Sequence, residues 1–166
     1  MITRSLQRFF TDDHRRLEDL LNRAVANPEK IDQALYEAFR RGLLKHIGME
    51  ERILLPAVLA ARGGGRFPMA SKLRMDHGAL AALLVPPPSP QIISAIRAIL
   101  TDHDPIEESP GGLYDLSAQL TSETVDALMA RVRSAPEVSA TPHNPDPGVL
   151  NVVRRILSRA GYNLDH

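Results

Sequence analysis

Two short sequence patterns decide the fold of this chain, and each occurs twice. The pattern D-H-x-x-L-x-x-L-L spans Asp13–Leu21 (DHRRLEDLL) and Asp76–Leu84 (DHGALAALL). The pattern H-x-x-x-E-E spans His46–Glu51 (HIGMEE) and His103–Glu108 (HDPIEE). The two patterns alternate along the chain. Since helix residues four apart lie on the same face, each H-x-x-x-E pair presents an imidazole and a carboxylate in one direction. The repetition predicts one site to which both halves of the chain contribute.

Four segments that contain these patterns have apolar residues at helical spacing. They span roughly residues 3–25, 28–61, 68–85 and 90–110. We expect Asn27 to cap the second segment with Pro28 in its first turn, and Ser89 to cap the fourth. Amphipathic helices joined by short links favour an all-α fold, an up-down-up-down four-helix bundle.

The C-terminal part of the chain differs from the four segments. We expect the bundle to occupy residues 1–120 as one domain and residues 121–166 to form an extension packed on it. Residues 122–134 predict a short helix. Residues 135–147 contain four prolines and predict an extended strap. Residues 147–160 predict a final basic helix with an apolar side.

The composition excludes several classes of function. The 166 residues carry no net charge, so nothing favours binding to nucleic acid or to a membrane surface. The chain has no cysteine, which excludes disulfides, iron–sulfur ligation and thiolate zinc sites. No run approaches the ~20 apolar residues that span a bilayer, and the first ten residues do not resemble a signal peptide. We expect a soluble cytoplasmic protein.

The repeated histidines and glutamates lie on the apolar stripes that should face the bundle interior. Buried ionised carboxylates need compensation, and no lysine or arginine shares these stripes. A pair of cations would supply the missing positive charge. Imidazole and carboxylate ligands suit iron, manganese or zinc. The candidate residues are His14, His46, Glu50, His77, His103 and Glu107.

Acidic residues adjoin these candidates in sequence. A metal-ligating histidine usually donates its second ring N–H to a carboxylate or carbonyl group. Neighbouring residues on a helix point about 100° apart, so each acidic residue either serves a histidine on another helix or faces water. We favour water for all of them, namely Asp13, Glu51, Asp76 and Glu108.

With these patterns in this order, the chain resembles the hemerythrin family, in particular the hemerythrin-like HHE cation-binding domains. The resemblance covers about residues 4–119 and includes the phrase HxxxEExxLLP from His46 to Pro56. It implies a four-helix bundle around two non-haem iron ions, joined by an oxo or hydroxo bridge, with manganese or zinc as substitutes. It also implies that Glu50 and Glu107 bridge the ions. The four histidines would complete the two sides.

The chain departs from oxygen-carrying hemerythrins at two positions. Ala81 stands where those proteins have a further histidine, so each metal would keep open positions. We therefore expect turnover or sensing to be favoured over stable oxygen storage. Pro105 separates His103 from Glu107, so the fourth helix either kinks there or begins a new turn with Asp104 as its cap. Glu107 is the least certain ligand, with Glu108 as its substitute.

Two functions remain open from the sequence. The first is a di-iron protein that binds or reduces a small oxidant, such as dioxygen, peroxide or nitric oxide, in oxidative or nitrosative stress. Its electrons would come from an unidentified external donor, since there is no cysteine. The alternative is an iron or oxygen sensor, in which a partner responds to metal-dependent folding of the C-terminal extension.

Overall fold

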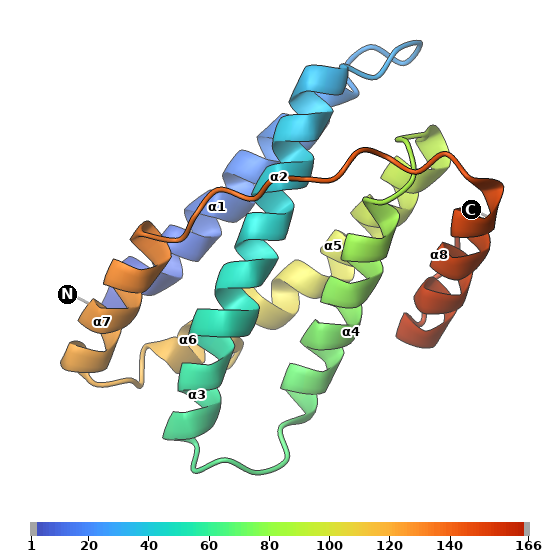
Figure 1. Ribbon diagram of the computed structural model, residues 1–166. Helices are drawn as coiled ribbons and strands as arrows, with labels where there is room; N and C mark the ends of the chain where they lie inside the picture. Colours follow the sequence, from blue (N-terminus) through green and yellow to red (C-terminus); the bar gives the residue numbers. More distant parts are fainter. Residues whose placement is uncertain (1–2, 165–166) are drawn as a thin grey trace.

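The computed structural model describes residues 3–164, and this part of the chain is helical without β-strands (Figure 1). The predicted all-α class is confirmed. The elements in chain order are α1 (Thr3–Ala24), α2 (Gln33–Met49), the π-helix η1 (Glu50–Leu54), α3 (Leu55–Ala61), α4 (Pro68–Leu83), α5 (Pro90–Glu108), α6 (Leu113–Ser117), α7 (Ser122–Arg133) and α8 (Pro147–Ala160).

The second helix begins later than predicted. Asn27 accepts a hydrogen bond from the backbone N–H of Glu29 and forms a turn rather than a helix cap. The cap of α2 is Asp32, whose carboxylate accepts from the N–H of Leu35 at 3.0 Å. Its own N–H donates to the carbonyl of Ala24 at 2.8 Å, which ties the start of α2 to the end of α1. The predicted start at Pro28 was wrong because Asp32 offers both contacts at once.

α2 runs on into α3 as one continuous rod (Figure 1). One turn of π-helix, which the periodicity did not predict, joins the two helices. The N–H of Leu55 donates to the carbonyl of Glu50, five residues back. Pro56 supplies a reason, because it has no N–H to donate to the carbonyl of Arg52. The guanidinium of Arg131 on α7 donates to that carbonyl instead, at 3.2 Å.

The fourth long helix passes through its proline. Ser89 caps α5 as predicted, and the helix then continues through Pro105 to Glu108. The alternative in which Asp104 caps a new turn is wrong. The chain reverses directly after α5 at Gly112, where a Cβ atom would lie 2.6 Å from the carbonyl oxygen of Ile106. This close turn leads into α6, an element that the sequence did not predict.

Apolar side chains form two clusters, one on each side of the repeated histidines. His14 illustrates the arrangement, because Phe10 one turn before it belongs to one cluster and Leu17 one turn after it belongs to the other. The same holds for His77, between Leu73 and Leu80. The apolar periodicity therefore places a polar layer between two apolar cores.

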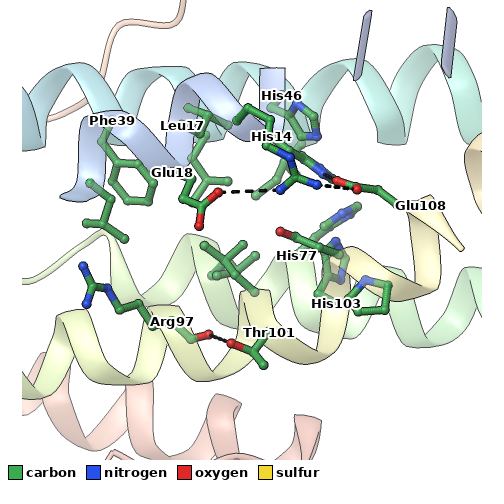
Figure 2. Close-up of a pocket in the computed structure, with 18 of the residues that line it drawn as sticks. His14, Leu17, Glu18, Phe39, His46, His77, Arg97, Thr101, His103 and Glu108 are labelled. Carbon is green, nitrogen blue, oxygen red and sulfur yellow. Dashed lines mark hydrogen bonds and ion pairs between the residues drawn. The ribbon is translucent and has the colours of Figure 1, made fainter. Parts of the chain in front are cut away.

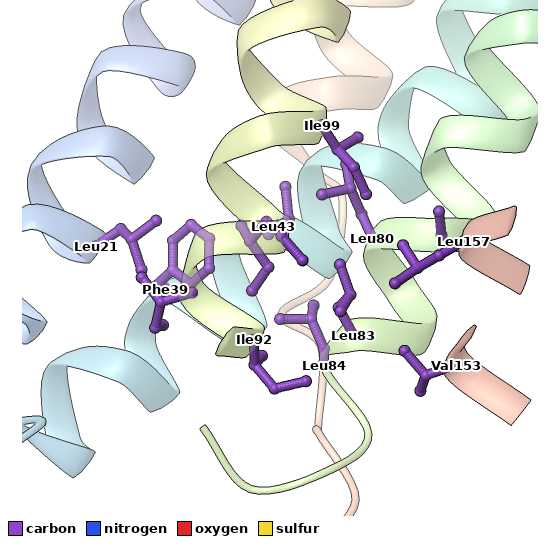
Figure 3. Close-up of a cluster of buried hydrophobic side chains, with 14 of the residues drawn as sticks. Leu21, Phe39, Leu43, Leu80, Leu83, Leu84, Ile92, Ile99, Val153 and Leu157 are labelled. Atoms are coloured by element: carbon purple, nitrogen blue, oxygen red, sulfur yellow. The ribbon is translucent and has the colours of Figure 1, made fainter. Parts of the chain in front are cut away.

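The predicted C-terminal elements are present. α8 occupies the predicted residues, and its Val153 and Leu157 pack beside Leu80 and Leu83 of α4 (Figure 3). The segment 135–146 is extended and crosses the bundle (Figure 1). Within residues 3–164, no helix is long and apolar enough to cross a membrane.

Candidate metal centre

The structure brings all six candidate ligands together in the polar layer. All are buried, and both glutamates are fully so. They form two groups that share the glutamates, and in each group the potential ligand atoms lie within 4.8 Å of one another. Figure 2 shows the four histidines converging on one pocket. The groups are His14, His46, Glu50 and Glu107, and Glu50, His77, His103 and Glu107.

Each buried glutamate extends one oxygen towards each histidine pair. Glu50 places Oε1 3.1 Å from Nε2 of His46 and Oε2 3.2 Å from Nε2 of His77. Glu107 places Oε2 3.3 Å from Nε2 of His14 and Oε1 3.1 Å from Nε2 of His103. Pro105 therefore does not remove Glu107 from the cluster. The two carboxylates span the two groups, which is the arrangement that bridging ligands require.

The outer ring nitrogens of the histidines are also paired, each with a carboxylate on a different helical segment. Nδ1 lies 2.6 Å from Glu108 in His14, 2.9 Å from Asp13 in His46, 2.7 Å from Glu51 in His77 and 3.2 Å from Asp76 in His103. Since an ionised carboxylate can only accept, each Nδ1 carries the proton, and each Nε2 turns towards the cluster. The expectation that these acidic residues face water was wrong. They fix the rings in the orientation that metal-binding histidines require.

Charge is concentrated in this layer, and it shifts the pKa values in opposite directions. Burial lowers the pKa of His46, but the carboxylates of Glu50, Asp13 and Glu107 together outweigh burial and raise it to about 10. Burial is likewise outweighed at His77 by Glu107 and Glu50 together, and at His103 by Glu107 and Asp76 together, so their pKa values rise to about 11 and about 9. Burial raises the pKa of Glu50, yet the histidines lower it to about 2. Without a cation, protons on the imidazoles balance the buried carboxylates.

The donor atoms fit a pair of cations. In the described part of the chain, three buried atoms of the cluster make close polar contacts but no contact with hydrogen-bond geometry: Oε2 of Glu50, Oε1 of Glu107 and Nε2 of His77. Such orphaned atoms are costly unless something satisfies them. Imidazole nitrogen and carboxylate oxygen suit iron, manganese and zinc. Ions held by the two groups would satisfy these atoms.

Tyr114 of α6 enters the cluster, although the sequence reasoning did not select it. Its hydroxyl donates to Oε1 of Glu50 at 2.5 Å and lies 2.9 Å from Nε2 of His14. Burial, together with the charges of Glu50 and Glu107, raises the pKa of Tyr114 well above its usual value. The sequence signal was weak, because Tyr114 stands alone in a short element without periodicity.

A cavity of about 630 Å³ leads to the cluster (Figure 2). All four histidines line it, together with apolar side chains such as Leu17 and Phe39. Its wall also carries charged residues, including Arg97, and Arg15, which forms an ion pair with Glu108 at 2.6 Å. A small molecule could reach the histidines through this cavity.

The two remaining histidines do not join the cluster in the described structure. His143 lies on the strap and stacks on Tyr36, with ring centroids 6.0 Å apart. Its Nε2 is 4.0 Å from the carboxylate of Glu37. His143 therefore contacts the bundle surface and does not supply a further ligand. His166 lies outside the described residues.

Comparison with known proteins identifies the family. The family model described as the hemerythrin HHE cation binding domain matches residues 5–133, and so includes α7. No similar protein was found among those with a curated function, and no similar solved structure was found. The match covers most of the chain and contains every residue of the buried cluster. The chain belongs to the hemerythrin family, as a hemerythrin HHE cation binding domain.

Proposed function

We propose that this protein is a non-haem di-iron protein that binds or reduces a small oxidant: dioxygen, peroxide or nitric oxide. The observation that carries the proposal is the pair of buried glutamates. Each glutamate extends one of its two oxygens to the pair His14 and His46 and the other to the pair His77 and His103. Iron ions held by these residues would supply redox chemistry and positions for exogenous ligands. In this account, α1, the α2–α3 rod, α4 and α5 form the up-down-up-down bundle around them.

The residues of this chain would hold the ions and control access to them. The carboxylates paired with Nδ1 keep the imidazoles oriented and increase their basicity. The two apolar clusters restrict water, while the cavity admits a small ligand. Ala81 supplies no ligand one turn after His77, which favours turnover over stable storage. Electrons would come from an external donor, and the cytoplasm is the compartment that we propose.

Peroxide consumption by the iron-loaded protein tests the proposal. We expect the wild-type protein to consume hydrogen peroxide in the presence of an electron donor. His46→Ala should abolish this activity, because it removes an imidazole from one group. His143→Ala is the matched control, since this histidine lies outside the cluster. Loss of activity in both variants, or in neither, would contradict the assignment.

A sensing function is the second candidate, supported by the attachment of the strap to the helix that carries His46. The buried guanidinium of Arg40 donates to the carbonyl of Leu84 at 2.8 Å and to that of Thr141 on the strap at 2.6 Å. Lys45, adjacent to His46, forms an ion pair with Glu137 at 2.5 Å. A change at the metal centre could therefore alter the strap.

Limited proteolysis separates the two candidates. A sensor should show metal-dependent cleavage within residues 135–146 and no peroxide turnover. A catalyst should show turnover with the same cleavage pattern in the presence and absence of metal.

A further inference from the structure

The geometry assigns Tyr114 as a direct ligand of the metal ion that His14 and His46 hold, which leaves the ion at His77 and His103 as the more open one. This inference rests on the proposed metal centre. It changes the number of ligands on each side. With Tyr114, one ion has five protein ligands and the other has four.

The phenol oxygen of Tyr114 lies among the donor atoms of one group. It lies 2.5 Å from Oε1 of Glu50, 2.9 Å from Nε2 of His14, 3.2 Å from Oε2 of Glu107 and 3.3 Å from Nε2 of His46. Nitrogen and oxygen ligands lie about 2.0–2.2 Å from such ions, so neighbouring ligands at right angles are about 3 Å apart. The phenol oxygen of Tyr114 is spaced as one more member of the same ligand set.

The phenol oxygen of Tyr114 has four polar partners. Tyr114 donates its one O–H to Glu50. The same oxygen also faces Glu107 and two imidazole nitrogens. Without a cation, protons on the imidazoles hold these atoms together. A cation among them would take the place of those protons, and it favours the ionised form of a coordinating group. The four convergent partners are therefore those that a further ligand of this ion would have.

The two groups differ in their contacts with Tyr114. Tyr114 faces the carboxylate oxygens that point to His14 and His46, not those that point to His77 and His103. On the other side, the polar contacts of Nε2 of His77 are the carboxylates of Glu50, at 3.2 Å, and Glu107, at 3.7 Å. Since Tyr114 has no counterpart there among these contacts, an exogenous ligand would bind on the His77 side.

Tyr114 is also held rigidly, as an effective ligand must be. The residue is fully buried, and its ring stacks on Phe10 with centroids 5.3 Å apart and an angle of 22° between planes. The carbonyl of Tyr114 accepts a hydrogen bond from the hydroxyl of Ser117 at 2.6 Å. The close turn at Gly112 holds the start of α6 against the end of α5. Little ordering is therefore needed when the metal binds.

Visible absorption and resonance Raman spectroscopy of the iron(III)-loaded protein test this inference. The wild-type protein should show a phenolate-to-iron charge-transfer band, with Raman modes that shift when ring-deuterated tyrosine is incorporated. Tyr114→Phe should lose the band at saturating iron. The chain has three tyrosines, so Tyr36→Phe and Tyr162→Phe are matched controls and should keep it.

The outcomes distinguish this inference from the proposed function. Two iron ions per chain without a phenolate band, or a band that persists in Tyr114→Phe, would overturn the assignment of Tyr114 and leave the metal centre standing. A wild-type protein that binds no iron would overturn both. The isotope shift is measured in the wild-type protein, so the test holds even if Tyr114→Phe does not fold.

Discussion

Replacing Asp13 by asparagine tests whether the carboxylates around the cluster orient the histidines. Asp13 is 15% exposed at its side chain and accepts from Nδ1 of His46 at 2.9 Å. An asparagine at this position would keep the size of the side chain but remove the charge from this hydrogen bond, which is worth about 1.5–3 kcal/mol. Loss of such a partner typically weakens metal binding roughly 10- to 100-fold, or about 1.4–2.7 kcal/mol. The asparagine amide oxygen still accepts a neutral hydrogen bond, which retains roughly half of this energy, so we expect a dissociation constant about tenfold higher.

A competitive titration with a chelator, under anaerobic conditions with ferrous iron, measures this change. Asp12→Asn is the matched control, because Asp12 is the preceding residue but is 68% exposed and pairs with Arg8 on the surface. An exposed pair of this kind contributes about 0–1 kcal/mol to stability and should not affect the metal. Equal affinity in Asp13→Asn and the wild-type protein would refute the argument that Asp13 orients His46.

Three other properties of the protein can be tested in the same way. Metal affinity should rise from about pH 6 to about pH 9 in a chelator titration, because the pKa of His46 is raised to about 10 and protons compete with the metal below that pH. A flat affinity profile would contradict this expectation. Since the proton on His46 stabilises the folded metal-free protein, that protein should lose stability as pH rises through about 10. Gly112→Ala should lower the free energy of unfolding by about 1–3 kcal/mol, because its Cβ would meet backbone carbonyls. Gly78→Ala, where the new Cβ has open space, should raise the free energy of unfolding by about 0.5–1 kcal/mol. Denaturant unfolding measures both changes, and the same change in the two variants would contradict the structure. Arg40→Ala should lower the free energy of unfolding by about 1.5–3 kcal/mol and expose the strap to proteases. Arg41→Ala, on the exposed side of the same helix, should lower it by at most about 1 kcal/mol and leave the strap protected.

The cluster residues could be predicted because helical spacing alone decides which side chains share a face. His46 and Glu50 are four residues apart on an apolar stripe, as are His103 and Glu107, so each pair faces inward in any bundle of these helices. The helices α1, α4 and α8 were predicted for the same reason, from the spacing of their apolar residues.

Features that depend on contacts between helices could not be predicted in this way. Whether Asp13 reaches a histidine or faces water depends on the rotation of α1 against α2, which periodicity does not define. Tyr114 enters the cluster through the turn at Gly112 and the short helix α6, neither of which has a repeating pattern. The π-helix had a signal in Pro56, but apolar periodicity is too coarse to show one extra residue in a turn.

The metal content of the protein purified from iron-supplied cells tests the central claim most directly. The two groups that share Glu50 and Glu107 predict two iron ions per chain. A protein that contains no iron, and takes up none when ferrous iron is added, would contradict the account.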